Sequence, residues 1–383
     1  MNWNQFYHEK FYWPIYKNRL EASFNFLRYI FGARLGKKTK LLGIYDCRVK
    51  KFSVGATFEF NLQLFCLAHQ KGIKKIDIAI ICNPLQPVKG SKYTSWITKD
   101  NWWYFFSELL LLLNLNPKLD SVFLFKSRKE LDRFLNQNLH HYFVFPPLFH
   151  YANELSERMG LYRFFRDFYR QYRFLPQLQI PKAINLWAKA FFQKYAAGRL
   201  PVAISLRLNP FHSIRRNSEL VVWQTLFQYC LEKKFNVVFV VVGRKNELAQ
   251  ASRLRLPNVI FSSDYEINIQ QELALIANAL FYMGTASGIA SLAFLSNRIP
   301  YVITNFLRGL KGDLIKYDWL KPGVKIPWQN PELQKLIFNK ETPESLIEEF
   351  ENLFLKIDKK KWQARAAIDP ALESILNWPH LIK

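Results

Sequence analysis

Glycine and hydroxyl residues follow a strongly apolar run in the second half of the sequence. Phe281–Gly284 has the pattern of a buried strand, and Thr285, Ala286, Ser287 and Gly288 follow it. We expect a helix of small residues from Gly288 to Leu295. Such a turn directs backbone N–H groups and a helix N-terminus to the carboxyl edge of a parallel sheet, where anions bind. The two hydroxyls add donors. The pattern therefore predicts a diphosphate site, with an ordinary strand-to-helix turn as the equal alternative.

Arginines follow the strand that we expect at residues 202–207. Arg207 ends this strand, and Arg215, Arg216 and Asn217 precede the next helix. The planar guanidinium makes bidentate contacts with phosphate. Because parallel strands end at one edge of a sheet, we expect Arg207 and Arg216 to lie beside the Gly284 turn. Solvated surface arginines are the alternative, above all for Arg215.

Two further loops follow expected strands in the same half. Gly243 and Arg244 come after the β-branched run at 236–243, and Asp264 lies in SSDYE at 262–266. Loops at strand ends hold nucleotide bases and riboses in doubly wound sheets. Each of these loops alone is a weaker signal than the arginine loop.

Strands and helices alternate along most of the chain, which is typical of parallel sheets. We expect an α/β protein with two Rossmann-like domains. The predicted parts are a basic aromatic segment at 1–40, a first domain at 41–195 that includes a basic helical bridge, a second domain at 196–340, and closing helices at 341–383. Within the last part we expect helices at 343–357 and near 370–378.

The chain is strongly basic. Its 54 Lys and Arg residues outnumber 30 Asp and Glu, which gives a net charge of +24 over 383 residues. Such an excess attracts nucleic acid, an anionic membrane or phosphorylated ligands. No signature of a common nucleic-acid-binding module is visible, so nucleic acid is the weaker alternative.

Aromatic and basic residues alternate in two segments. Residues 16–35 have helical spacing of apolar residues, and arginines recur at 163, 166, 170 and 173 within 161–174. Such helices lie on anionic lipid or pack on a domain. The sequence has no stretch long and apolar enough to span a membrane and no signal peptide pattern at its start. We therefore expect a cytoplasmic protein, peripheral on the inner membrane face.

Four cysteines, at 47, 66, 82 and 230, are too few for a disulfide framework, and they have no zinc-ligand spacing. We expect reduced, mostly buried thiols and no metal.

The second half resembles the C-terminal half of GT-B glycosyltransferases over residues 200–310. The resemblance rests on GRKNE (243–247), LPNVIFSSDYEI (256–267) and ELALIANALFYMGTASGIASLAFLSNRIPYVITNF (272–306). It points to a family of bacterial glycosyltransferases and, more distantly, to heptosyltransferases and to fucosyltransferases with a phosphate-binding arginine. It implies two Rossmann-like domains facing a central cleft, with a nucleotide-sugar in the second and the acceptor in the first. It also implies that Arg207, Arg216, Thr285, Ser287 and Gly288 contact the diphosphate without a metal, and the chain has no D-x-D motif where one would bind.

The resemblance also implies a catalytic base after the first glycine of the N-terminal half. Heptosyltransferases have an aspartate directly after that glycine, whereas this chain has Ala56. We expect Gly55 in a loop and Glu59, the nearest carboxylate, at the start of the following helix. Asp46 at the end of the first strand is the substitute; both base and stereochemistry stay open. His69 and His212 are weaker candidates, because a lone histidine is more often structural.

These observations predict a glycosyltransferase of polysaccharide biosynthesis, metal-independent and inverting. It would move a hexosyl, deoxyhexosyl or heptosyl group from a nucleotide-sugar to a surface-glycan or lipid-linked acceptor. One alternative is a non-catalytic protein that keeps the fold, which the absence of a catalytic aspartate at Ala56 favours. The other is a basic nucleic-acid-binding protein.

Overall fold

The computed structural model describes residues 38–47, 53–82, 101–146, 161–209, 214–306 and 325–368. The chain forms two compact units, Met1–Gln179 and Ile180–Lys383. We expected the division near residue 195. It lies earlier because the helix at 182–196 packs on a helix of the second unit. The predicted helices at 16–35 and 370–378 lie outside the described residues.

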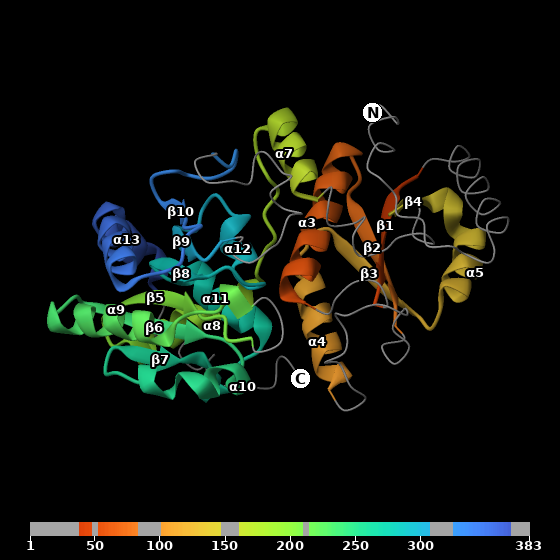
Figure 1. Cartoon of the computed structure of the whole chain (residues 1–383). Helices are drawn as coiled ribbons and strands as arrows, with labels where there is room; N and C mark the ends of the chain where they lie inside the picture. Colours follow the sequence, from red (N-terminus) through yellow and green to blue (C-terminus); the bar gives the residue numbers. More distant parts are fainter. Residues whose placement is uncertain are drawn as a thin grey trace. The chain divides into compact units, whose positions relative to one another are not determined.

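The first unit is built on a parallel four-stranded sheet in the order β3-β2-β1-β4. Its elements are β1 (Lys40–Asp46), α3 (Val54–Gln70), β2 (Lys75–Ile81), α4 (Trp102–Leu113), β3 (Leu119–Phe125), α5 (Arg128–Asn138), the short turn η1 (Leu139–His141), β4 (Tyr142–Phe145) and α7 (Leu161–Tyr172). Helices α3 and α4 cover one face of the sheet and α5 covers the other (Figure 1). Strict alternation of side chains along β1 and β2 supplies apolar groups to both faces.

Helix α3 starts earlier than the sequence suggested. The Ser53 hydroxyl accepts the N–H of Ala56 at 3.3 Å and caps the helix at Val54. We expected Gly55 in a loop and Glu59 at the start of the helix. Gly55 instead lies in the first turn, and Glu59 lies in the second.

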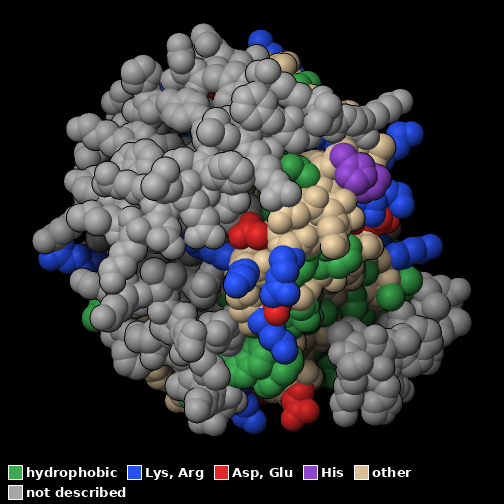
Figure 2. All heavy atoms as spheres, turned by 90° about the vertical axis from the view of Figure 1, so that its right-hand side faces the viewer, with side chains coloured by type: hydrophobic (Ala, Val, Ile, Leu, Met, Phe, Trp, Pro, Cys, Tyr) green, Lys and Arg blue, Asp and Glu red, His purple; other side chains and the backbone are tan. Residues whose placement is uncertain are grey.

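Among the described residues no Lys or Arg is fully buried, whereas several carboxylates, such as Asp46 and Asp77, are. Figure 2 shows one face, on which Lys and Arg side chains lie among hydrophobic and fewer acidic ones. On α7, Phe165 and Phe168 are buried while Arg163 and Arg170 are exposed. The arginine spacing seen in the sequence therefore belongs to the solvent face of a helix whose aromatic face packs on α3.

The second unit has a parallel six-stranded sheet in the order β10-β9-β8-β5-β6-β7. Its strands are β5 (Leu200–Ser205), β6 (Val237–Val242), β7 (Val259–Phe261), β8 (Phe281–Thr285), β9 (Tyr301–Thr304) and β10 (Gln334–Leu336). Its helices and short turns are α8 (Lys182–Ala196), η2 (Ile214–Arg216), α9 (Leu220–Glu232), α10 (Lys245–Leu248), η3 (Ala249–Leu254), η4 (Ser262–Tyr265), α11 (Ile269–Asn278), α12 (Ser291–Phe294), α13 (Pro343–Lys356) and α14 (Lys359–Ala366). The sequence did not predict β10 or α14.

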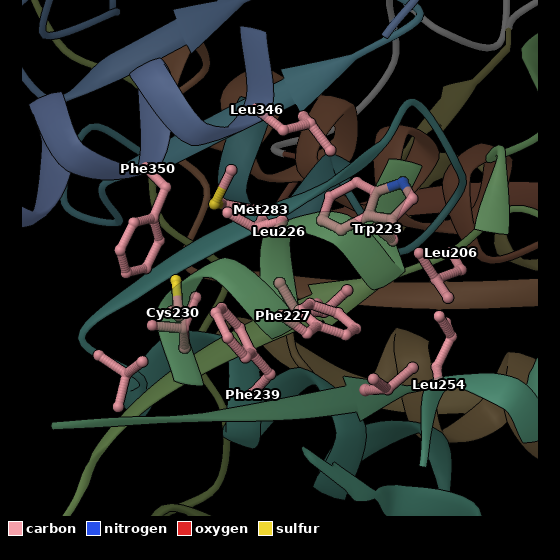
Figure 3. Packing of buried hydrophobic residues seen from close by; sticks show 14 of the residues in the cluster. Leu206, Trp223, Leu226, Phe227, Cys230, Phe239, Leu254, Met283, Leu346 and Phe350 are labelled. Atoms are coloured by element: carbon pink, nitrogen blue, oxygen red, sulfur yellow. The ribbon is translucent and has the colours of Figure 1, made fainter. Parts of the chain in front are cut away.

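A large apolar core holds α9 and α13 against one face of this sheet. Trp223 and Phe227 of α9 and Phe350 of α13 pack against Phe239 and Met283 of the strands (Figure 3). Helices α8 and α11 contact the sheet as well as each other. The sheet is thus buried on both faces, which explains the continuous apolar run of β6.

Candidate functional site

The strand order of the second unit locates its ligand-binding edge. The chain runs from β5 to β6 and β7 on one side of the sheet, and then to β8, β9 and β10 on the other. Neighbouring β5 and β8 therefore form the topological switch point. In open parallel sheets ligands bind outside the carboxyl ends of the strands at this point. The arginine loop after β5 and the glycine turn after β8 both begin there.

Direct contacts join these two loops. The Arg216 guanidinium donates from Nη2 to the carbonyl oxygen of Ala286 at 2.5 Å. The hydroxyls of Ser218 and Thr285 share a hydrogen bond, and Ser218 Oγ accepts the backbone N–H of Arg207 at 3.0 Å. The structure thus brings Arg207, Arg216 and Thr285 together. Ser218 is the residue that links them, and the sequence analysis did not single it out.

Asn217 shapes the arginine loop with its side chain. Its amide Nδ2 donates to the carbonyl oxygen of Asn209 at 2.8 Å, and its Oδ1 accepts the Asn209 N–H at 3.2 Å. Asn305, after β9, donates to the Asn217 carbonyl oxygen at 3.3 Å. The Asn217 amide is therefore engaged within the protein, and we read it as a residue that positions Arg216.

Gly284 is required by the close approach of β8 to β5. A Cβ atom at this position would lie 2.6 Å from the Ser205 carbonyl oxygen and 2.7 Å from the hydroxyl oxygens of Ser205 and Tyr282. Those two hydroxyls hydrogen-bond each other, and burial raises the pKa of Tyr282. The glycine that we expected to face a ligand thus makes room for neighbouring backbone.

The helix after this turn is shorter than expected. We predicted a helix from Gly288 to Leu295 whose N-terminus would face the diphosphate. Helix α12 covers only Ser291–Phe294, and the residues before it form a turn. With one helical turn the aligned peptide dipoles contribute little. The cationic and polar groups available at this turn are therefore the arginines and hydroxyls rather than a helix N-terminus.

The two arginines that face this edge are partly withdrawn from water, whereas Arg215 is exposed. Burial lowers the pKa of Arg207, and the carboxylate of Glu247 in α10 opposes that shift. A site that penalises a positive charge gains when an anion binds beside it. The edge therefore favours an anionic ligand.

A second group of predicted residues lies further along the sheet. Gly243 has φ +153° and donates its N–H to Ser262 Oγ at 3.3 Å, and Arg244 caps α10. Asp264 follows β7, and β6 lies between β7 and β5. Asp264 is therefore two strands away from the arginine loop that follows β5. Arg255 holds the Asp264 carboxylate in a bidentate ion pair at 2.8 and 2.9 Å, which lowers the pKa of Asp264. Asp264 is thus engaged in a partly exposed ion pair.

A cavity of about 540 Å³ adjoins the arginine loop at the N-terminus of α9. Its size falls in the range of small-molecule sites. Asn217 and Ser218 belong both to its wall and to the contacts at the switch point. The lining residues are Leu208, Asn217, Ser218, Glu219, Leu220, Val221, Gln250 and Arg253.

Glu341 supports the site from beneath. Its Oε1 accepts the backbone N–H of Glu219 at 2.7 Å and the Trp223 indole N–H at 3.2 Å, and its Oε2 accepts the Thr304 hydroxyl at 2.7 Å. Its own N–H donates to Asn305 Oδ1 at 3.3 Å. This buried carboxylate ties α9 to β9, and no spacing in the sequence pointed to it.

The two carboxylates proposed as a base are both engaged in the first unit. Asp46 is buried and accepts Nε of Arg128 at 2.7 Å, in an ion pair between the end of β1 and the start of α5. The Tyr162 hydroxyl of α7 donates to Glu59 of α3. Asp46 is therefore held as a structural ion, while Glu59 is half-buried and accepts the Tyr162 hydroxyl.

Of the two histidine candidates, the structure describes only His69. His69 is surrounded by the rings of Phe168, Tyr172 and Phe174, with centroid distances of 5.0 to 5.8 Å. His212 lies outside the described residues. Among the residues that the structure describes, no three His, Cys, Asp or Glu side chains are placed to hold a metal ion. Within the same residues, no helix has both the length and the apolar character needed to cross a bilayer.

Comparisons with known proteins support the fold. No family model and no curated protein matches the chain. Among solved structures, ADP-heptose LPS heptosyltransferase II of E. coli has a TM-score of 0.52 at 15% identity, over 83% of this chain and 99% of that one. A glycosyl transferase family 9 protein of Veillonella parvula has a TM-score of 0.49 at 11% identity, over 90% of this chain and 98% of that one. The first of these likenesses shows that the chain has the GT-B fold, with two Rossmann-like domains.

Proposed function

We propose that the chain is a glycosyltransferase that binds the diphosphate of a nucleotide-sugar at the β5–β8 switch point. The observation that carries this proposal is the bond from Arg216 to Ala286, in which a guanidinium contacts the turn after β8. The fold adds support, because a neighbour with the same fold is an ADP-heptose LPS heptosyltransferase. Donor sugar, nucleotide and acceptor stay at the level of class: a nucleotide-sugar and a surface glycan or lipid-linked acceptor.

The chemistry of transfer explains why cationic donors are needed. Breaking the bond between the anomeric carbon and the phosphate leaves negative charge on the departing diphosphate. Fixed donors that face this charge stabilise it without reorganising. Arg207 and Arg216 supply the positive charge and Ser287 supplies a hydroxyl, whereas the fully buried Thr285 bonds Ser218 and supports the turn from within. A metal ion is not required in this proposal.

The test compares two adjacent arginines. Arg216→Ala removes the guanidinium that contacts Ala286, and we expect the affinity for a nucleoside diphosphate to fall by about 1–3 kcal/mol, the value of a charge-assisted hydrogen bond. Arg215→Ala is the matched control, because Arg215 is exposed and one residue away. Calorimetric titration with ADP, GDP, UDP and CDP measures both variants and identifies the base.

Equal affinities of the two variants would remove Arg216 from the site. If the unaltered chain binds none of the four nucleotides, the nucleotide-sugar proposal itself is overturned. A stabilising nucleotide also raises the midpoint of thermal unfolding, which gives an independent readout of the same binding.

We propose Glu59 as the base that takes the proton of the acceptor hydroxyl. It is half-buried and has a hydroxyl donor in Tyr162, whereas Asp46 is held by Arg128. Glu59→Gln keeps the shape and the contact with Tyr162 but removes basicity. We expect sugar transfer to fall by a factor of roughly 100 or more with unchanged donor affinity. Transfer at the normal rate would exclude Glu59 as the base.

The second candidate function is a binding protein without catalysis. Two observations favour it. Both candidate carboxylates, Asp46 and Glu59, already have protein partners, and the chain has Ala56 where heptosyltransferases have an aspartate. Such a protein would bind the nucleotide-sugar and leave it intact. Release of free sugar or transfer to an acceptor, followed by mass spectrometry of the donor, distinguishes the two candidates.

We further propose that the protein binds peripherally to the inner face of an anionic membrane. The support is the net charge of +24 and the exposed arginines of α7, with basic side chains also on the face in Figure 2. Polybasic surfaces gain about 1 kcal/mol per Lys or Arg near anionic lipid. Flotation with neutral and with phosphatidylserine vesicles tests it, and equal recovery in both would refute it.

A further inference from the structure

Two of the four cysteines follow directly on neighbouring strands. Strands β1 and β2 lie side by side in the first sheet, and their register ends with Asp46 opposite Ile81 (Figure 1). Cys47 and Cys82 are the next residues on the two strands. The backbone still runs in step there, because Cys47 donates its N–H to the Ile81 carbonyl oxygen at 2.9 Å. The two cysteines therefore occupy adjacent positions at the carboxyl edge.

Both thiols lie on the same face of the sheet. Along each strand alternate side chains point to opposite faces. Cys47 is part of the apolar cluster beneath α3 and α4, and Cys82 packs against this same cluster. Neighbouring strands lie about 4.8 Å apart. Cα atoms joined by a disulfide are typically about 4.4–6.8 Å apart, so closing this pair needs little backbone movement.

The geometry points to a reversible dithiol–disulfide site formed by Cys47 and Cys82. All four cysteines lie in described residues, and none is in a disulfide in this structure. Oxidation would join the carboxyl ends of β1 and β2 next to Asp46 and its ion pair with Arg128. The site is independent of the proposed glycosyl transfer and would be a redox-sensitive modification of the first unit.

The surroundings assign different roles to the two thiols. Cys82 is half-buried, and the hydrogen bond from the Cys47 thiol holds its pKa below the ordinary value although burial opposes this shift. Cys47 is buried. A partly accessible thiol with a lowered pKa is the one that attacks an oxidant, and its buried neighbour then resolves the intermediate.

The remaining two cysteines are matched controls in the same chain. Cys66 and Cys230 are buried in α3 and α9. Burial raises the pKa of Cys66 well above its ordinary value and that of Cys230 to about 12. Both thiols should therefore stay reduced in the folded chain.

The chemistry balances with a low-molecular-weight disulfide as the oxidant. The Cys82 thiolate attacks one sulfur of oxidised glutathione, and one glutathione thiolate leaves. The Cys47 sulfur then attacks Cys82 Sγ in the mixed disulfide, and the second glutathione leaves. Two protein thiols lose two electrons in total, the oxidant gains them, and the two protons end on the released glutathione molecules.

The experiment titrates the folded full-length chain with graded mixtures of reduced and oxidised glutathione. Acid stops the exchange, and the remaining thiols are alkylated after unfolding and mapped by mass spectrometry. We expect one cross-linked peptide pair containing Cys47 and Cys82, which dithiothreitol reverses. Cys66 and Cys230 should stay reduced in the folded chain and therefore be recovered fully alkylated. Their exchange with oxidised glutathione should be on the order of tenfold or more slower than that of Cys82.

Two variants assign the order of steps. Cys47→Ser should stop at a stable glutathione adduct on Cys82, and Cys82→Ser should leave Cys47 reduced. Three results would overturn the proposal: no oxidation of the pair, a persistent adduct on Cys82 in the unaltered chain, or equal reaction of Cys66 or Cys230. The unaltered chain alone yields these outcomes, so a variant that does not fold leaves the test intact.

Discussion

The carboxyl edges of the two parallel sheets carry opposite kinds of chemistry. In the second unit, Arg207 and Arg216 lie at this edge with the Thr285 hydroxyl, and the guanidinium of Arg216 contacts a neutral carbonyl. In the first unit, the edge carries the carboxylate of Asp46, which Arg128 neutralises. In our proposal the first of these edges receives an anion from outside, whereas the second satisfies its own charge. The same strand–helix architecture supports both, because the loops differ.

The largest expected effect tests whether Arg128 and Arg216 have these different roles. Arg128→Met leaves the buried Asp46 carboxylate without its ion pair, and we expect the first unit to lose about 3–5 kcal/mol of unfolding free energy. Arg216→Met should cost less, about 1–2 kcal/mol, because it removes a partly exposed guanidinium bonded to a neutral carbonyl and leaves no buried charge behind. Hydrogen exchange of β1 and β8 peptides measures both units in the full-length chain.

A double variant controls for the loss of packing. Asp46→Asn combined with Arg128→Met removes the buried charge, so part of the lost stability should return. If the double variant is as unstable as Arg128→Met, packing rather than charge explains the effect, and the contrast between the two edges disappears.

A pair of strand glycines sharpens the comparison of the two sheets. Gly284→Ala would place a Cβ 2.6 Å from the backbone oxygen of Ser205, which cannot rotate away. Gly43→Ala would meet the side chain of Leu64, whose methyl groups can move. We expect about 3 kcal/mol of destabilisation for Gly284→Ala and about 1–2 for Gly43→Ala. Thermal and urea unfolding would contradict this prediction if the order were reversed.

The smallest expected effect concerns the pH dependence of Glu341. Burial raises its pKa above the ordinary value of 4.5. The folded chain therefore holds the Glu341 proton more tightly than the unfolded chain does. This contribution to stability is complete below pH 4.5 and is lost as the pH rises through the raised pKa.

The Glu341→Gln variant provides the reference. Relative to this variant, the unaltered chain should lose unfolding free energy as the pH rises from 4.5 toward neutrality, by about 1.4 kcal/mol for each unit by which the folded pKa exceeds 4.5. Unfolding curves at several pH values measure the difference. If the unaltered chain instead gains unfolding free energy relative to the variant as the pH rises, the three hydrogen-bond donors, rather than burial, dominate the pKa of Glu341.

The alternation of strands and helices could be predicted from the sequence, because a continuous β-branched run such as that of β6 is typical of a strand buried on both faces of a sheet. The start of α3 and the length of α12 could not. Ser53 decides the first by capping the helix at Val54. In the second, small residues are compatible with helix and turn alike, and packing after β8 selects the turn.

The candidate site divides in the same way. Arg207, Arg216 and Thr285 could be found because each follows a strand end, and parallel strands end at one edge. Ser218 carried a usable signal, since it stands before a helix next to the arginines. Glu341 carried none, because its partners Glu219 and Thr304 lie far away in the chain.

The sequence by itself determined the alternation of strands and helices, the edge at which the loops gather and the excess of positive charge. These follow from local patterning and composition, which need no knowledge of distant partners. Only the tertiary structure decided that Asp46 is neutralised by Arg128, that Tyr162 donates to Glu59, and that Cys47 lies beside Cys82. Pairing of this kind depends on which strands and helices become neighbours. A residue's type therefore suggested its chemistry, and its partners in space decided whether that chemistry is available.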